Sequence, residues 1–156
     1  AGIMECIFCK IVDGKIPCAK VFESKTVLCF LDINPGNKGH VLVIPKQHHV
    51  TMETIPADVA KDIMDAARKL CLALPAVTAC DGYNLLMNNG VAAGQEVMHC
   101  HLHIMPRFAN DDFRFKFMGD TERMYDIIVV LKDSAGFIYS GTLSKMSGKK
   151  DPSMCF

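Results

Sequence analysis

The stretch MHCHLHIM occupies residues 98–105 and alternates histidine with apolar residues. Residues two positions apart in a β-strand point to the same side of the sheet. The alternation therefore predicts a strand, ended by Pro106, on which His99, His101 and His103 stand in one row. The residues between them are expected to face the apolar core: Cys100, Leu102 and Ile104.

A row of three imidazoles can do chemistry that other polar side chains cannot. Imidazole has an unperturbed pKa of about 6.5, so it can act as nucleophile, acid or base near neutral pH. A nucleophilic histidine needs one free ring nitrogen, while a carbonyl or carboxylate holds the other. The row is also compatible with a metal site, or with a half-buried strand whose polar face is merely rich in histidine. Lysine, threonine or glutamate would serve a solvated face as well, so the strict alternation favours a chemical role.

The segment before this strand is rich in glycine and amide side chains. Gly90 and Gly94 would let backbone N–H groups approach an anion closely, and Asn88, Asn89 and Gln95 supply neutral donors. Taken alone, the segment is more typical of an ordinary connecting loop. Beside the histidine row, it predicts a phosphate cradle.

The flanking segments predict a mixed fold. Residues 56–74 have apolar side chains every three to four positions, which predicts a helix that starts near a Thr54 cap and stops at Pro75. Residues 5–13 could form one or two helical turns. Runs rich in branched and aromatic residues predict strands at 20–23, 26–33, 40–45 and 83–90. The order favours an α+β domain with an antiparallel sheet of about five strands, one long helix and one short helix.

Both ends of the chain carry weaker signals. Residues 1–4 are expected to be a cloning remnant or a disordered start, and residues 5–117 the domain proper. In the C-terminal extension, 118–156, we expect a helix at 121–132, a strand at 136–143 and a loose polar tail over the last dozen residues.

Composition narrows the class of protein. Half of the 156 residues are apolar, and 17 basic residues balance 17 acidic ones. This balance does not favour bulk electrostatic capture of nucleic acid or of an acidic membrane. No stretch is long and apolar enough to span a bilayer, and no secretory signal is visible, so we expect a cytoplasmic protein whose eight cysteines are thiols.

Two of these cysteines form a Cys6-x-x-Cys9 pair. This spacing is typical of half a zinc site, or of a redox pair in a thioredoxin-like βαβ context that the sequence lacks. A tetrahedral site of Cys6, Cys9, one of His48 and His49, and His99 is chemically sound. Four protein ligands would close the site and make the metal structural.

Four motifs in this order resemble the histidine-triad (HIT) family, and in particular the zinc-bearing microbial members of its Hint branch. The resemblance covers about residues 5–117 and rests on CIFCKIVDGKIP (6–17), FLDINPGNKGHVLVIPKQH (30–48), NLLMNNGVAAGQEVMH (84–99) and HCHLHIM (99–105). It implies a purine nucleoside phosphoramidate hydrolase that cleaves at the α-phosphate of an AMP-like substrate. It also implies a homodimer in which the two sheets are continuous.

The resemblance assigns roles to individual residues. It implies that His101 is the nucleophile, that a nucleotidyl-His101 intermediate forms, and that His103 contacts the phosphate and helps the leaving group. The implied substrate-binding residues are Asn88, Gly94 and Gln95 at the phosphate and ribose, Asp32 at the ribose hydroxyls, Val97, and the apolar base walls Ile7, Phe8, Ile16 and Phe30. The implied ligands of a structural zinc are Cys6, Cys9, His48 and His99, which selects His48 over His49.

Two departures from the family pattern concern the choice of substrate. Glu96 stands where many Hint relatives carry serine or threonine, and a carboxylate there would repel an anion. The segment PRFANDDF (106–113) differs from the tryptophan-bearing tail of the animal proteins. A dinucleoside polyphosphate hydrolase, a non-catalytic nucleotide-binding or protein-interaction module, and a hydrolase with zinc in the triad remain alternatives.

Overall fold

The structure is a computed structural model that describes residues 5–114, 128–133 and 136–142. The chain divides into two compact units, Ala1–Phe113 and Arg114–Phe156. The predicted start at 1–4 and the predicted polar tail lie outside the described residues. Each unit is described by itself.

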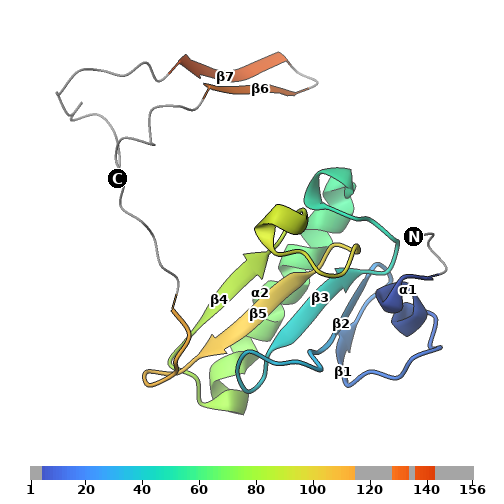
Figure 1. Cartoon of the computed structure of the whole chain (residues 1–156), viewed down its shortest axis with the longest axis vertical. Coiled ribbons are helices and arrows are strands. Elements are labelled where there is room, and N and C mark those ends of the chain that lie inside the picture. The colour runs from blue at the N-terminus through green and yellow to red at the C-terminus, as the bar shows by residue number, and fades with distance from the viewer. Residues whose placement is uncertain (1–4, 115–127, 134–135, 143–156) are drawn as a thin grey trace. The chain divides into compact units, whose positions relative to one another are not determined.

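Within the described residues of the first unit, five strands form one antiparallel sheet in the order β1-β2-β3-β5-β4 (Figure 1). The α+β class and the five-stranded sheet predicted from the sequence are confirmed. The strands are β1 (Lys20–Glu23), β2 (Val27–Leu31), β3 (Val41–Pro45), β4 (Gly82–Met87) and β5 (Leu102–Arg107).

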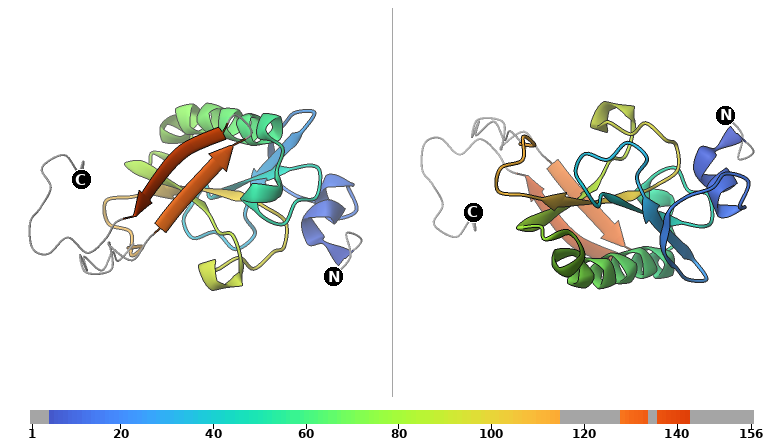
Figure 2. Two further views of the ribbon diagram at one scale, coloured as in Figure 1. Left: turned by 90° about the horizontal axis from the view of Figure 1, so that it is seen from above. Right: turned by 90° about the horizontal axis from the view of Figure 1, so that it is seen from below.

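The two faces of the sheet bury different apolar clusters. The long helix α2 (Ala57–Thr78) covers one face, and the loop between β4 and β5 rises from the other (Figure 2). Under α2 the core includes Cys100, Leu102 and Ile104, as the alternation predicted. On the opposite face the short helix α1 (Ile7–Val12) contributes Phe8 to a cluster with residues of β2 and β3: Leu28, Phe30, Leu42 and Ile44.

The strand predicted at 98–105 is displaced toward the C-terminus. It begins at Leu102 and ends at Arg107, because the N–H of Cys100 donates to the carbonyl oxygen of His49 (2.6 Å), a loop partner. Pro106 does not end it. Pro106 lies beyond Ile104, which is the last β5 residue that pairs with β3. The strand has a neighbour on only one side there, so proline is tolerated.

Helix α2 also differs from the prediction at both ends. Pro56, and not Thr54, occupies the N-cap, since the Thr54 hydroxyl donates to the carbonyl oxygen of Thr51 (2.7 Å). The helix continues through Pro75 to Thr78. Its last turn is held by the Thr78 hydroxyl, which donates to the carbonyl oxygen of Leu74 (2.8 Å), and both side chains are buried. Tertiary packing thus outweighs the backbone hydrogen bond that proline cannot form.

In the second unit, β6 (Ile128–Asp133) pairs with β7 (Gly136–Thr142) as an antiparallel hairpin. The strand expected at 136–143 is confirmed, but the helix expected at 121–132 is wrong over its described part. The run IVVL is rich in β-branched residues, which favour strands, and a short continuous apolar run does not distinguish a helix from a strand. None of the helices in the described ranges is long and apolar enough to cross a membrane.

Candidate active site and metal centre

The middle histidine of the triad is anchored by the backbone of the first. His101 Nδ1 lies 2.7 Å from the carbonyl oxygen of His99. Since a carbonyl can only accept, Nδ1 carries the proton and Nε2 keeps its lone pair. The ring is 6% exposed and packs edge-on against Phe8, with ring centroids 5.2 Å apart. His101 therefore presents a nucleophilic nitrogen in fixed orientation.

The third histidine is oriented by a fourth that sequence analysis missed. His40, just before β3, accepts from the backbone N–H of Gly36 at Nδ1 (3.2 Å), so its proton resides on Nε2. This Nε2–H donates to His103 Nδ1 (2.9 Å). The proton of His103 then resides on Nε2, which makes that nitrogen a hydrogen-bond donor. The rings of His101 and His103 are 4.8 Å apart.

Burial keeps these two supporting rings neutral. Burial, together with the smaller effects of the neighbouring His101 and His40, lowers the pKa of His103 to about 4. Burial also lowers the pKa of His40, against the opposing effect of the Asp32 carboxylate 3.6 Å away. Near neutral pH, His40 and His103 therefore act as dipoles rather than as charges.

A second cluster gathers the four predicted metal ligands. The ligand atoms of Cys6, Cys9, His48 and His99 all lie within 4.8 Å of one another. Cys6 Sγ is 3.5 Å from His99 Nδ1, and Cys9 Sγ is 3.3 Å from His48 Nδ1. A tetrahedral zinc, with bonds of about 2.3 Å to sulfur and about 2.0 Å to nitrogen, holds such atoms about 3.5 Å apart.

The protonation of the cluster also fits a cation. His99 Nε2–H donates to the carbonyl oxygen of Pro45 (2.8 Å), so Nδ1 keeps its lone pair, and burial lowers the pKa of this ring to about 4. Burial and the neighbouring Cys6 raise the pKa of Cys9 to about 11. Two thiolates this close require a compensating positive charge, which a divalent metal supplies.

The loop between β4 and β5 is held by its own side chains. Gly94 has a φ of +86°, which favours glycine, and its carbonyl oxygen accepts from Asn88 Nδ2 (3.2 Å). The N–H groups of Gly94 and Gln95 donate within the loop, to Val91 and Gly90. Among the described residues, the backbone N–H groups of Glu96 and Val97 have no acceptor. They are the donors that an anion could take up.

Gln95, which the resemblance assigns to the phosphate and ribose, has a side chain that bonds within the protein. Its side chain is 3% exposed, accepts from the N–H of Gly90 (2.8 Å) and donates to the carbonyl oxygens of Val50 (2.6 Å) and Val97 (3.1 Å). Both N–H bonds of the amide and its oxygen are thus engaged with the protein. Gln95 therefore holds the loop in shape.

The remaining predicted residues share one cavity of about 680 Å³ on the face opposite α2. Its lining also includes Glu96, His40, Met105 and Phe113. The predicted residues in the lining are Ile7, Phe8, Ile16, Phe30, Asp32, Asn88, Gly94, Val97, His101 and His103.

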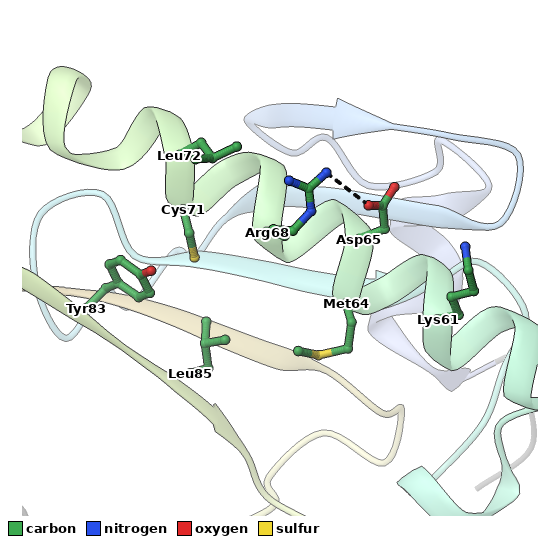
Figure 3. Close-up of a pocket in the computed structure, with 8 residues that line it drawn as sticks. All are labelled: Lys61, Met64, Asp65, Arg68, Cys71, Leu72, Tyr83 and Leu85. Atoms are coloured by element: carbon green, nitrogen blue, oxygen red, sulfur yellow. Dashed lines mark hydrogen bonds and ion pairs between the residues drawn. The ribbon is translucent and has the colours of Figure 1, made fainter.

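A second hollow, of about 540 Å³, lies between α2 and the edge strand β4 (Figure 3). Its apolar side chains are exposed: Met64 by 51%, Leu72 by 72%, Tyr83 by 46% and Leu85 by 42%. Figure 3 shows Met64 and Leu85 reaching toward one another from the two elements. No residue of the predicted active site belongs to it.

Comparison with known proteins identifies the family of this chain. The HIT domain family matches residues 13–110. An uncharacterized HIT-like protein of Methanocaldococcus jannaschii is 45% identical over 131 residues, which cover 84% of this chain and 99% of that protein. An adenosine 5'-monophosphoramidase of Schizosaccharomyces pombe is 46% identical over 104 residues, which cover 67% of this chain and 75% of the relative.

Solved structures include a zinc-bound member. The crystal structure of a zinc-bound histidine triad family protein from Mycobacterium smegmatis superposes with a TM-score of 0.69 at 36% identity, over 78% of this chain and 88% of that one. The similarity supports the fold and draws attention to the Cys6, Cys9, His48 and His99 cluster.

The hydrogen-bond chain predicts distinct imidazole tautomers. We expect long-range ¹H–¹⁵N spectra to show His101 with its proton on Nδ1 and His103 with its proton on Nε2. His103 should stay neutral from pH 8 to about pH 5 and titrate near pH 4. An unfolded histidine, with a pKa of about 6.5, binds this proton more tightly, so folding stability should fall as the pH drops from about 6.5 toward 4. Titration of His103 near pH 6.5, in spectra assigned with His103→Asn, would contradict the burial argument.

Proposed function

Because this chain belongs to the HIT domain family, we propose that it hydrolyses nucleotides at the α-phosphate, and that its substrate is a purine nucleoside 5'-phosphoramidate. The observation that carries this proposal is the orientation of His101, whose Nδ1 is fixed on the His99 carbonyl (2.7 Å) while the ring lines a nucleotide-sized cavity. Relatives named adenosine 5'-monophosphoramidase support it at the family level.

The proposed reaction proceeds in two displacements. His101 Nε2 attacks the α-phosphorus, the bond from phosphorus to the leaving nitrogen breaks, and the amine departs with a proton taken from solvent. The His99 carbonyl stabilises the positive ring that results. Water then attacks phosphorus, the bond to Nε2 breaks, one proton returns to solvent, and a nucleoside monophosphate is released with His101 neutral.

Neutral donors would stabilise the phosphoryl group throughout. His103 Nε2–H is oriented by His40 to donate to a phosphoryl oxygen or to the leaving nitrogen. The N–H groups of Glu96 and Val97 and the Asn88 amide would complete the cradle. Asp32 would accept from the ribose hydroxyls, and the base would lie against apolar walls formed by Ile7, Phe8, Ile16 and Phe30.

Replacement of the proposed nucleophile should abolish the reaction without changing the fold. We expect His101→Asn to lower kcat/KM for adenosine 5'-phosphoramidate by about 10³-fold or more, as removal of other enzyme nucleophiles does. AMP binding by calorimetry and the circular dichroism spectrum should be retained. Mass spectrometry of the wild-type protein, quenched at alkaline pH, should show a nucleotidyl adduct on His101. Unchanged turnover in the variant would contradict the nucleophile assignment, and AMP binding without turnover or adduct would favour a non-catalytic module.

We also propose that Cys6, Cys9, His48 and His99 hold one structural zinc. The ion would tie α1 to the loops around His48 and His99, and thus fix the carbonyl on which His101 rests. Its chemistry would be limited to charge compensation of the two thiolates, because all four ligand positions come from the protein.

Loss of a zinc ligand should lower stability before it affects chemistry. We expect Cys9→Ser to reduce the zinc content from about one per chain and to lower Tm by about 5–15 °C, which corresponds to a few kcal/mol. Cys80→Ser, a half-buried cysteine outside the cluster, should keep both values. Zinc would be measured by plasma mass spectrometry and Tm by calorimetry. Equal zinc content in both variants would contradict the assignment, while loss of turnover without loss of stability would indicate zinc in the reaction.

The expected homodimer with a continuous sheet remains part of the proposal, as does a cytoplasmic location. Strand β4 lies at one edge of the sheet and leaves backbone groups available for a second β4. The hollow beside it exposes Met64, Leu72 and Leu85, an apolar surface that a second copy would cover.

Charge placed on this edge should therefore separate the subunits. Sedimentation equilibrium should give twice the chain mass of 17.2 kDa for the wild type. Leu85→Arg should shift the protein toward the monomer. Val21→Arg, equally exposed on the opposite edge strand β1, should remain a dimer. If Val21→Arg dissociated the dimer and Leu85→Arg did not, the interface would lie at β1, and the proposed interface at β4 would be wrong.

A further inference from the structure

The proposed nucleotide cavity holds no permanent positive charge. None of the described residues that line it is lysine or arginine. Its charged side chains are two carboxylates, Asp32 and Glu96. The low pKa values of the buried His40 and His103 keep these rings neutral near pH 7. A site for a phosphorylated substrate thus carries net negative charge, which is unusual for phosphate recognition.

The two carboxylates differ in what they contact. Asp32 accepts from the backbone N–H of Asn34 (2.9 Å) and faces His40 Nδ1 at 3.6 Å. Glu96 is exposed, and within the described part of the chain its carboxylate makes no hydrogen bond or ion pair. It lies between Gln95 and Val97, on the loop that also contributes Gly94 to the lining.

Glu96 is positioned so that its charge can act on the leaving group. Its own backbone N–H is one of the loop donors without an acceptor, and the residue lines the cavity, so it adjoins the phosphate in the proposed complex. The base walls come from α1, the loop that follows it and β2, on other segments of the chain. A charge at the phosphate acts on whatever group departs from phosphorus, because that group leaves from the same atom.

We propose that Glu96 selects the leaving group by charge, favouring amines that carry a second, cationic group and disfavouring anionic leaving groups such as polyphosphate chains. This inference rests on the proposed function and narrows its substrate class to nucleoside 5'-phosphoramidates of diamines or other aminoalkyl amines. An exposed carboxylate about 4 Å from an ammonium group attracts it only modestly in water. A preference of about tenfold is therefore expected rather than absolute discrimination.

Three adenosine 5'-phosphoramidates that differ only at the end of the amine would test the proposal. Their leaving groups are butylamine, 1,4-diaminobutane joined through one nitrogen, and 4-aminobutanoate. At low ionic strength we expect kcat/KM of the wild type to be about tenfold higher for the cationic than for the neutral amide, and about tenfold lower for the anionic one. The differences should shrink in about 0.5 M salt, where charges are screened within a few ångströms.

Glu96→Gln keeps the shape of the side chain and removes its charge. In this variant the three kcat/KM values should converge to within about threefold of one another. Glu53→Gln is the matched control, because Glu53 is an exposed carboxylate that does not line the cavity, and it should keep the wild-type order.

The outcomes separate this inference from the function on which it rests. Cleavage of the neutral amide without a charge preference, or a preference that survives Glu96→Gln, would overturn the role of Glu96 alone. If none of the three amides is cleaved and no nucleotidyl-His101 adduct forms, the proposed function and the inference both fail.

Discussion

The hydrogen bond from His101 Nδ1 to the His99 carbonyl (2.7 Å) links the two sites of the molecule. His99 is fully buried, and its ring donates from Nε2 to Pro45 while Nδ1 faces Cys6 and Cys9. Both ring nitrogens and the backbone oxygen of this one residue are therefore engaged. Any shift of His99 would move the acceptor that defines the tautomer of His101. The proposed metal ligands and the proposed nucleophile are thus adjacent but separate, because the first set uses the side chain of His99 and the second its backbone.

Side chains alternate between the two faces of the sheet, so the histidines and the apolar core residues of the same segment lie on opposite sides. Cys100, Leu102 and Ile104 pack beneath α2, while His101 and His103 face the cavity on the opposite side. A shift of one residue in the pairing of β5 would exchange these two sets and bury imidazoles against α2. The register Leu42–His103 and Leu86–His103, with β3 on one side and β4 on the other, excludes that exchange. The apolar residues that stabilise the fold thereby also fix the side to which the histidines point.

Much of this could be predicted from the sequence, because alternation and turn residues are local signals. The triad row, the apolar side of α2 and the strands predicted at 26–33 and 40–45 follow from residue patterns along the chain. His40 was missed because its contact with His103, 63 residues away, depends on the pairing of β3 with β5, which no local pattern specifies. No local pattern brings the Cys6 and Cys9 pair to His48 and His99 either. Only the family resemblance predicted that these four residues form one cluster. The helix end predicted at Pro75 was wrong for the opposite reason. Proline is a strong local signal for a helix end, but the packing of Leu74 and Thr78 continues the helix past it.

The absence of lysine and arginine from the described lining has a consequence for turnover. A permanent cation would bind the phosphate of substrate, intermediate and product alike, and uniform binding of this kind does not accelerate a reaction. Fixed N–H dipoles and neutral imidazoles can be aimed at the oxygens on which charge accumulates during displacement. They would hold a product dianion less strongly than a guanidinium does. Burial keeps His40 and His103 neutral, so these two rings act in the site as oriented donors rather than as cations. The carboxylate of Glu96 is then the charge that a departing group encounters in the proposed reaction.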